Sequence, residues 1–175
     1  MQAKNGIPVM KRVIVIGCPG SGKTTFSEKL RDISDLPLFY LDAIWHKADR
    51  THISRDEFDA RLTEILTRDP AEWIIDGNYS RTLERRMAAC DTVFLFDLPT
   101  EVCLAGAVSR LGKWRVDMPW VDTELDPRLA CEIENFRREN LPVTYDLIDK
   151  YREGREIVIF KSRKEADDFL ESLKP

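Results

Sequence analysis

The chain has 175 residues, of which 43% are hydrophobic and 33% charged, and its formal net charge at pH 7 is −4. These proportions are typical of a globular protein, and the length fits one domain. They exclude a helical membrane span, because no apolar run approaches the roughly 20 residues that a bilayer requires. The acidic balance argues against nucleic acid as the main partner, because such proteins normally carry a basic excess.

The start of the chain and its cysteines bear on the compartment. The first residues, MQAKNGIPVMKR, hold no apolar stretch of secretory length, so we expect no signal peptide and a soluble, cytoplasmic protein. The four cysteines lie far apart and form no CxxC pair, which argues against both a zinc site and a disulfide framework. They are Cys18, Cys90, Cys103 and Cys131.

The first third of the chain predicts two strands and two helices. The β-branched run RVIVIG at 12–17 is typical of a strand buried on both faces of a parallel sheet, and KTTFSEKLRD, from residue 23, has the spacing of a one-faced helix. LPLFYLD at 36–42 predicts a second strand that an aspartate closes. Ser54 and Glu57 form a capping box at the start of the second helix.

The rest of the chain repeats this alternation. Further strands are predicted at 72–77, 92–98 and 156–160, and further helices at 102–111, from about 127, and after Ser162. Residues 112–127 have no clean period and are rich in turn formers, so we expect a surface excursion there. Pro142 is expected to break or kink the helix that follows the excursion. Strand and helix alternate five times, which predicts an α/β fold with a parallel sheet and helices on both faces. We see no linker or repeat and predict a single domain over residues 1–175.

A phosphate-binding loop is the strongest signal in the sequence. Residues 17–24, GCPGSGKT, match GxxxxGK followed by Ser or Thr, and they stand between a predicted strand and a predicted helix. The glycines let backbone N–H groups and the helix N-terminus face phosphate oxygens. Lys23 is predicted to meet the β- and γ-phosphates of ATP, and the Thr24 hydroxyl to coordinate Mg²⁺. The predicted ATP-binding residues of this segment are Gly17, Pro19, Gly20, Ser21, Gly22, Lys23, Thr24 and Thr25.

Three aspartates follow predicted strands. Asp42 and Asp76 end the second and third strands, which places both at the carboxyl edge of the sheet, where ligands of open α/β folds bind. Either residue could hold Mg²⁺, directly or through water, or orient an acceptor hydroxyl, and each could instead be a turn or cap residue. Asp97 also follows an apolar run, but a structural role in a turn is as compatible with its position as a role in the reaction.

Arginines are the second functional signal, because cations catalyse phosphoryl transfer by stabilising developing charge. Arg81 and Arg85 lie one helical turn apart after the DGNY loop, beside Arg86, and are predicted to clasp an acceptor phosphate. Further basic residues open or follow the excursion: Arg110, Lys113, Arg115, Arg137 and Arg138. Singly, each is typical of a solvated surface charge, but three clusters beside predicted edge loops favour a site.

Aromatic residues leave a choice open. Trp45 and His46 follow Asp42 and could line an acceptor pocket or simply pack. Trp73 is expected in the core, and Trp114 and Trp120 are expected to anchor a mobile flap.

The segments that carry a resemblance to a known family are, in order, GCPGSGKTT, a strand-end aspartate, WIIDGNYSRT, DTVFLFDLP and a helix ending in SR. Nearly the whole chain resembles adenylate kinase and its relatives. The pairing of LDAIW with WIIDGNYSRT resembles most closely the bacterial topology modulation proteins. The resemblance implies a P-loop NTPase sheet of order 2-3-1-4-5, a short lid at about 112–127 and an acceptor region at about 42–86. ATP and Mg²⁺ are the implied cofactors, and a small-molecule acceptor is the implied partner.

The resemblance also implies roles for individual residues. Arg110 corresponds to the arginine that covers the adenine, and Arg115 to a lid arginine that reaches the phosphates. Arg137 or Arg138 corresponds to the post-lid arginine; spacing does not choose between them, and our leading hypothesis takes Arg138. Arg81 is the nearest counterpart of the arginine that holds an acceptor phosphate.

The predicted site divides by role. The predicted catalytic residues are Lys23, Arg110, Arg115, Arg138 and Asp42, and Arg110 is also predicted to bind ATP. The residues predicted to bind the acceptor are Asp42, Trp45, Asp76, Gly77, Asn78, Arg81 and Arg85. The metal is predicted to bind to Thr24 and Asp76. Adenylate kinases show DGFPRT where this chain has DGNYSRT, so AMP does not follow as the acceptor. Two alternatives to a kinase stay open: an ATP-binding regulatory protein that acts on DNA topology through a local patch at 81–86, and a partner-coupled ATPase.

Overall fold

The computed structural model describes residues 10–174. The expectation of a chain without a secretory leader concerns mainly residues 1–9, which lie outside the described part. Within the described part, no helix is both long and apolar enough to cross a membrane.

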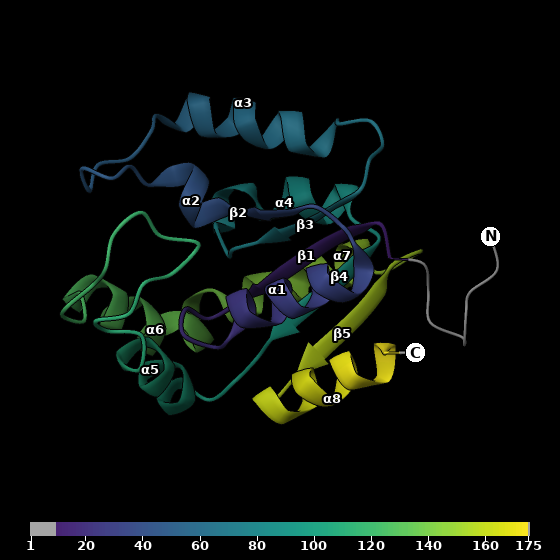
Figure 1. Ribbon diagram of the computed structural model, residues 1–175. Coiled ribbons are helices and arrows are strands. Elements are labelled where there is room, and N and C mark those ends of the chain that lie inside the picture. The colour runs from purple at the N-terminus through teal and green to yellow at the C-terminus, as the bar shows by residue number, and fades with distance from the viewer. Residues whose placement is uncertain (1–9, 175) are drawn as a thin grey trace.

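One parallel sheet forms the centre of the molecule (Figure 1). Its strands are β1 (Arg12–Gly17), β2 (Leu38–Tyr40), β3 (Trp73–Asp76), β4 (Thr92–Phe96) and β5 (Glu156–Phe160). Their spatial order is β2-β3-β1-β4-β5, and every pairing is parallel. The predicted α/β class and the predicted order 2-3-1-4-5 are therefore confirmed.

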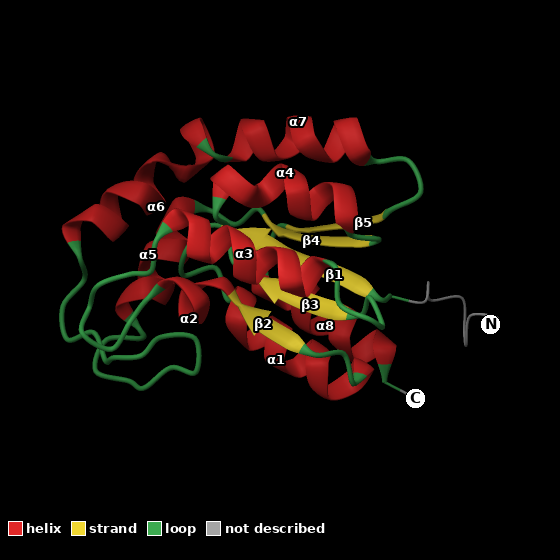
Figure 2. Ribbon diagram, turned by 90° about the horizontal axis from the view of Figure 1, so that it is seen from above, coloured by secondary structure: helices red, strands yellow, loops and turns green. Residues whose placement is uncertain are grey.

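Eight helices surround the sheet within the described residues. They are α1 (Lys23–Ser34), α2 (Leu41–Trp45), α3 (Arg55–Leu66), α4 (Ser80–Ala89), α5 (Thr100–Val108), α6 (Pro127–Glu139), α7 (Leu141–Tyr151) and α8 (Arg163–Leu173). Figure 2 shows α1 and α8 on one face of the sheet and α3, α4 and α7 on the other. Helices α5 and α6 lie toward the carboxyl ends of the strands, and the irregular segment between them, residues 109–126, contains most of the predicted lid at about 112–127; it is called the lid below.

Local signals in the sequence are borne out at three helix ends. The Ser54 side chain accepts a hydrogen bond from the Glu57 N–H at the start of α3, and Ser162 does the same for the Glu165 N–H at the start of α8. Pro142 lies in the first turn of α7, where its missing N–H costs nothing, so it separates α7 from α6 rather than kinking one long helix.

The second strand is shorter than predicted. Only Leu38–Tyr40 pair with β3, and the last pair joins Tyr40 to Asp76, where β3 itself ends. Beyond that point the chain has no strand to pair with, and its helix-forming residues coil into the short helix α2. The expectation that Asp42 ends a strand is therefore wrong, because Asp42 lies in the first turn of α2.

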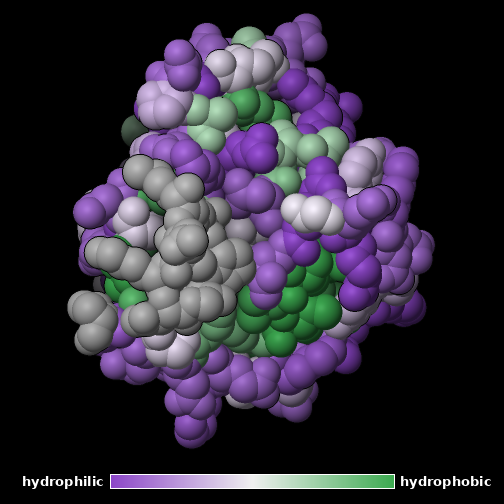
Figure 3. All heavy atoms as spheres, turned by 90° about the vertical axis from the view of Figure 1, so that its right-hand side faces the viewer, coloured by the Kyte–Doolittle hydropathy of each residue, from purple (hydrophilic) through white to green (hydrophobic). Residues whose placement is uncertain are grey.

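The core consists of the sheet and the apolar faces of the helices. Trp73 is fully buried, as expected, and Phe26 packs edge-on against Phe94 and Phe96. Figure 3 shows the side of the molecule away from the lid, where the surface is largely hydrophilic apart from hydrophobic areas below the centre and near the top. The carboxyl edge of the sheet, where ligands of open α/β folds bind, lies at the opposite end.

Candidate active site

The phosphate-binding loop connects β1 to α1 in a conformation that only glycine adopts readily. Gly17 and Gly20 have φ of 138° and 78°. A Cβ on Gly17 would lie 2.5 Å from the Phe96 carbonyl oxygen, and one on Gly20 would lie 2.1 Å from the Cys103 carbonyl oxygen. The loop is therefore seated directly against β4 and α5, which leaves its other side open.

Arg163, at the start of α8, fixes the loop from outside the motif. Its guanidinium donates to the carbonyl oxygens of Gly20 (2.9 Å) and Ser21 (3.2 Å) and to that of Val102 on α5 (3.3 Å). These bonds tie the loop to α5 and α8 and so fix its path. Sequence analysis missed this residue: it stands about 140 residues after the loop, and only the topology brings it there.

Two side chains of the motif face the pocket. Lys23 Nζ donates to the Cys18 carbonyl oxygen at 2.8 Å, and the Thr24 hydroxyl donates to Asp117 Oδ2 at 3.2 Å. Both interactions stay within the site, so the ammonium and the hydroxyl are held where a nucleotide phosphate and its metal would replace these partners. Thr25 also lines the pocket but is exposed, whereas Ser21 is fully buried under the loop.

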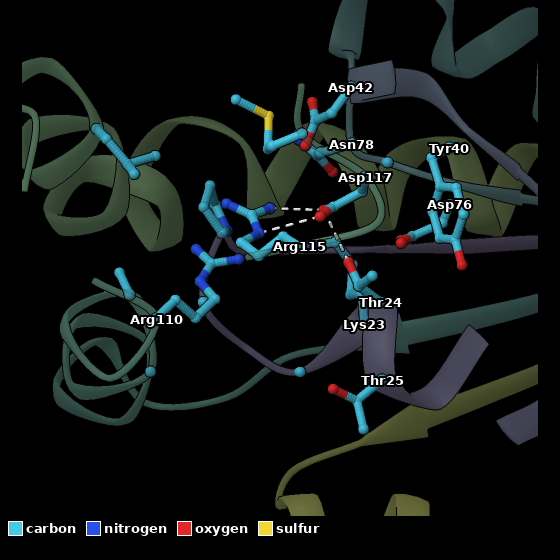
Figure 4. Close-up of a pocket in the computed structure, with 18 of the residues that line it drawn as sticks. Lys23, Thr24, Thr25, Tyr40, Asp42, Asp76, Asn78, Arg110, Arg115 and Asp117 are labelled. Atoms are coloured by element: carbon cyan, nitrogen blue, oxygen red, sulfur yellow. Dashed lines mark hydrogen bonds and ion pairs between the residues drawn. The ribbon is translucent and has the colours of Figure 1, made fainter. Parts of the chain in front are cut away.

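The lid reaches into the site through Asp117, a residue that sequence analysis did not single out. Asp117 is only 3% exposed although it belongs to an irregular segment. Arg115 donates to it through Nε (3.0 Å) and Nη2 (2.5 Å), so one carboxylate joins the lid arginine to Thr24 (Figure 4). Nothing in the aperiodic sequence around Asp117 distinguishes it from a surface aspartate.

Asp76, the last residue of β3, is buried beside the loop. It is 5% exposed, and its Oδ1 has no hydrogen-bond partner within the described residues. Burial raises the pKa of Asp76 to about 7, while Lys23 and the Thr24 hydroxyl lower this pKa and Asp42 raises it. A buried carboxylate oxygen without a partner calls for a ligand.

These oxygen atoms fit a hard cation such as Mg²⁺. Within residues 10–174, no group of three or more His, Cys, Asp or Glu residues is arranged as a metal cage. Mg²⁺ is usually held by one or two carboxylates together with substrate phosphates and water. Thr24 and Asp76, with Asp117 beside them, supply a donor set of that kind, so the residues are compatible with a nucleotide-bound metal.

Asp42 is held in place by an aromatic neighbour. The Tyr79 hydroxyl donates to Asp42 Oδ1 at 2.8 Å, and the Tyr79 ring stacks on Phe58 of α3 with the centroids 5.1 Å apart. Tyr79 has φ of 28°, a strained value for a non-glycine residue. Trp45 packs edge-on against Tyr79 and Phe58 and also lines the pocket, and its role toward an acceptor stays a prediction.

The loop that carries Tyr79 is clamped from below by Arg86. Arg86 is fully buried and donates to the carbonyl oxygens of Gly77 (2.8 Å), Asn78 (2.6 Å) and Tyr79 (3.0 Å). Burial lowers the pKa of Arg86 to about 9, which leaves it charged at neutral pH. The suggestion that Arg86 helps clasp an acceptor phosphate, or belongs to a DNA-binding patch, is therefore wrong.

Several predicted residues lie outside the pocket. Arg81 forms two hydrogen bonds with Asp59 at 2.8 Å each, and Arg85 lies 3.6 Å from the same carboxylate. Both belong to a surface contact between α4 and α3.

The post-lid arginines also turn away from the pocket. The Arg138 side chain is 75% exposed and binds Asn135 and Glu139 on its own helix. Arg137 binds the buried Asp97, which also accepts hydrogen bonds from Tyr145 and Lys161. Asp97 thus has a structural role that joins α6, α7 and the end of β5.

A pocket of about 980 Å³ brings the remaining residues together. Of the predicted residues, its lining includes Pro19, Gly20, Gly22, Lys23, Thr24, Thr25, Asp42, Trp45, Asp76, Gly77, Asn78, Arg110 and Arg115. Figure 4 shows Asp42, Asn78 and Asp117 gathered above Thr24, with Arg110 on the lid side. Arg110 is half-buried, and burial and the neighbouring Arg115 lower its pKa. A space of this size is at the upper end for small-molecule sites and can take two ligands of modest size.

The sheet order, the glycine loop and the lid define the fold of the P-loop kinases. Among solved structures of this fold, the chain is similar to a shikimate kinase from Acinetobacter baumannii in complex with shikimate, with 16% identity and a TM-score of 0.59 over 94% of this chain and 90% of that one. It is also similar to a shikimate kinase from Bacteroides thetaiotaomicron, with 13% identity and a TM-score of 0.57 over 94% and 96% of the two chains. A sugar kinase from Janibacter sp. HTCC2649 matches with 16% identity and a TM-score of 0.52 over 93% and 91%. No protein-family model and no curated protein sequence matches the chain.

Proposed function

We propose that this protein is an ATP- and Mg²⁺-dependent kinase that transfers the γ-phosphoryl group of ATP to a hydroxyl group of a small molecule. One observation carries the proposal: the phosphate loop and an aspartate held by its own hydrogen-bond donor, Asp42, open into the same pocket. The neighbours described above, named as shikimate and sugar kinases, support a small-molecule acceptor.

The nucleotide end of the proposed reaction rests on Lys23 and the loop. The loop N–H groups and Lys23 bind the β- and γ-phosphates and stabilise the charge that develops as the terminal P–O bond breaks. Thr24 and Asp76 would hold Mg²⁺, which supplies further neutralisation of the phosphate charge when bound. Arg110 and Arg115 approach from the lid, where they exclude water and add positive charge.

The acceptor end rests on Asp42. Its carboxylate accepts the proton of the acceptor hydroxyl while that oxygen forms a bond to the γ-phosphorus and ADP departs. Tyr79 keeps Asp42 Oδ1 occupied, so Oδ2 is the oxygen available for the proton. Asp42 is therefore the proposed general base.

A coupled ADP-release screen tests the proposal. Purified protein with ATP and Mg²⁺ is assayed against hydroxyl compounds of different classes, and each rate is compared with the rate without acceptor. We expect acceptor-dependent ADP release and a phosphorylated product visible by mass spectrometry. Lys23→Ala should lower the rate by about 10²- to 10³-fold without lowering the Tm, whereas Lys164→Ala, a substitution at an exposed lysine of α8, should leave it unchanged. Equal ADP release with and without every acceptor would instead indicate an ATPase coupled to a partner.

A further inference from the structure

The charges that line the pocket are divided unevenly between two groups of elements. The nucleotide half comprises the phosphate loop, α1, the end of α5, the first part of the lid up to Met118, and α8. The acceptor half comprises the end of β2, α2, the end of β3 with the loop after it, the lid from Trp120, and α6. The basic residues among the lining are Lys23, Lys29, Arg110, Lys113, Arg115 and Arg163, and the nucleotide half contributes all of them.

The acceptor half contributes only acidic charge. Its acidic lining residues are Asp42, Asp76, Asp122, Glu124, Asp126 and Glu132, and none of its lining residues within the described chain is Lys or Arg. His46 adds no positive charge at neutral pH, because burial lowers its pKa from an already modest value. Asp76 is assigned to Mg²⁺ above, so a ligand in this half meets mainly the negative charge of the other carboxylates, with Lys23 as the cation that acts on Glu132.

Two of these carboxylates are available to a ligand. Asp42 keeps one oxygen free beside its bond with Tyr79. Glu132, on α6, is an exposed residue that lines the pocket, and it forms no ion pair with any described residue. Burial raises the pKa of Glu132, the charge of Lys23 lowers it, and Asp42 raises it. Two carboxylates that share a pocket and form no ion pair favour a bound cation, which would relieve their repulsion.

Aromatic side chains complete the acceptor half. Tyr40, Trp45 and Trp120 line it, and Trp120 already lies under the guanidinium of Arg50, with 5.7 Å between the charge centre and the ring. Aromatic faces next to carboxylates are the usual surroundings of a bound ammonium group. Carboxylates and aromatic rings are separate observations, and both point to the same ligand charge.

We propose that the acceptor is a hydroxyl compound that carries an ammonium group, of the amino sugar, aminocyclitol or amino alcohol class, with Glu132 binding the ammonium and Asp42 the reacting hydroxyl. This proposal rests on the proposed kinase function. It disfavours acceptors that carry a carboxylate or phosphate, because Arg81 and Arg85 are bound to Asp59 outside the pocket, and the arginines that line the pocket belong to the nucleotide half.

The first test compares acceptors that share a skeleton and keep the same primary hydroxyl but differ in the charge of one substituent. Glucosamine and glucose form one such pair, and amino alcohols and aminocyclitols with their neutral and carboxylate analogues form others. ADP release and product mass are measured for each at fixed ATP and Mg²⁺. We expect kcat/KM for an ammonium compound to exceed that for its neutral analogue by about 10- to 100-fold, as charge-assisted hydrogen bonds imply.

The second test changes the protein. Glu132→Gln should bring the ratio of kcat/KM between the ammonium and neutral compounds close to one, and the matched substitution Glu134→Gln, on the same helix but outside the pocket, should keep the wild-type ratio. Thermal melting checks that both variants fold. A preference for neutral or anionic acceptors, or a ratio that Glu132→Gln leaves unchanged, would overturn this proposal while leaving the kinase proposal intact. Turnover with no acceptor of any charge would overturn both.

Discussion

The two halves of the pocket are built in opposite ways. The nucleotide half depends on backbone: eight consecutive residues, 17–24, form a loop whose path is set by its glycines and by the hydrogen bonds from Arg163 to the Gly20 and Ser21 carbonyls. The acceptor half depends on side chains from α2, the loop after β3, the lid and α6, which lie far apart in the sequence. A backbone site leaves a contiguous signature in the sequence, and a side-chain site does not.

The halves also differ in charge, and this difference separates the residues proposed to bind ATP from those proposed to select the acceptor. Under the proposed function, the basic residues of the nucleotide half neutralise the phosphates of ATP. The acidic and aromatic residues of the acceptor half, apart from Asp76, contact the acceptor. Substitutions in the first half should therefore affect turnover of any acceptor, and substitutions in the second should affect the choice among acceptors or the chemical step.

The largest expected effect is at the boundary between the halves, at Asp42. Asp42→Asn keeps the shape but removes the base, so kcat should fall by about 10²- to 10⁴-fold, whereas the Kd for ATP should change little. Tyr79→Phe removes only the donor to Asp42 and should cost less. Steady-state kinetics with a titration of a non-hydrolysable ATP analogue measure both quantities. An Asp42→Asn enzyme with normal kcat would assign the proton to another group.

Arg86 tests whether the acceptor half has a rigid support. Arg86→Met removes a buried cation that binds three consecutive carbonyls of the loop at 77–79, so we expect a loss of about 3 to 5 kcal/mol in the free energy of unfolding. Urea denaturation measures this loss. The same substitution at the adjacent, exposed Arg85 is the control and should cost less than about 1 kcal/mol. Equal losses in the two variants would contradict a special role for Arg86.

The pH dependence of stability tests the burial of Asp76. Its pKa is about 7 in the folded protein, well above its ordinary value. Between about pH 4 and pH 7 the unfolded chain has released this proton and the folded chain has kept it, so stability falls as the pH rises. Relative to Asp76→Asn, the wild type should lose about 1.4 kcal/mol per pH unit within that window. Unfolding curves of both proteins at pH 5 and pH 7 measure the difference, and parallel pH profiles would contradict a buried, protonated Asp76.

The lid is the part of the nucleotide half that the motif does not include. Asp117→Asn should loosen it, because the buried pair with Arg115 loses its charge and the bond from Thr24 is weakened. We expect amide exchange in residues 112–122 of the nucleotide-free protein to accelerate about 10-fold. Glu124→Gln, an exposed change in the same segment, should leave the exchange rates as they are. Unchanged exchange in Asp117→Asn would mean that other contacts hold the lid.

The division between the halves also explains which parts of the fold and of the site could be predicted from the sequence. Periodicity and the glycine motif predicted the strands and the loop, because both depend on local backbone preferences, whereas the strand order came from the resemblance to adenylate kinase and its relatives. Asp76 was placed correctly at a strand end, but Asp42 was not, since the end of β2 depends on where its partner β3 ends. The contributions of Glu132, Asp117, Tyr79 and Arg163 depend on tertiary contacts between distant segments. Spacing in the sequence carries no information about such contacts.

The smallest expected effect is the one that most sharply separates this acceptor half from a phosphate-binding one. Sequence spacing predicted that Arg81 and Arg85 hold an acceptor phosphate, yet both side chains pair with Asp59 on α3. Arg81→Ala should therefore change kcat/KM for the preferred acceptor by less than about twofold, and stability by less than about 1 kcal/mol, as exposed ion pairs usually do. The same kinetic and stability measurements on Asp59→Ala serve as the matched comparison, because loss of either partner of the ion pair should have the same small effect. If Arg81→Ala weakened apparent acceptor binding by about tenfold or more in steady-state kinetics, and Asp59→Ala did not, Arg81 would have to leave Asp59 when the acceptor binds. The acceptor would then carry a negative charge.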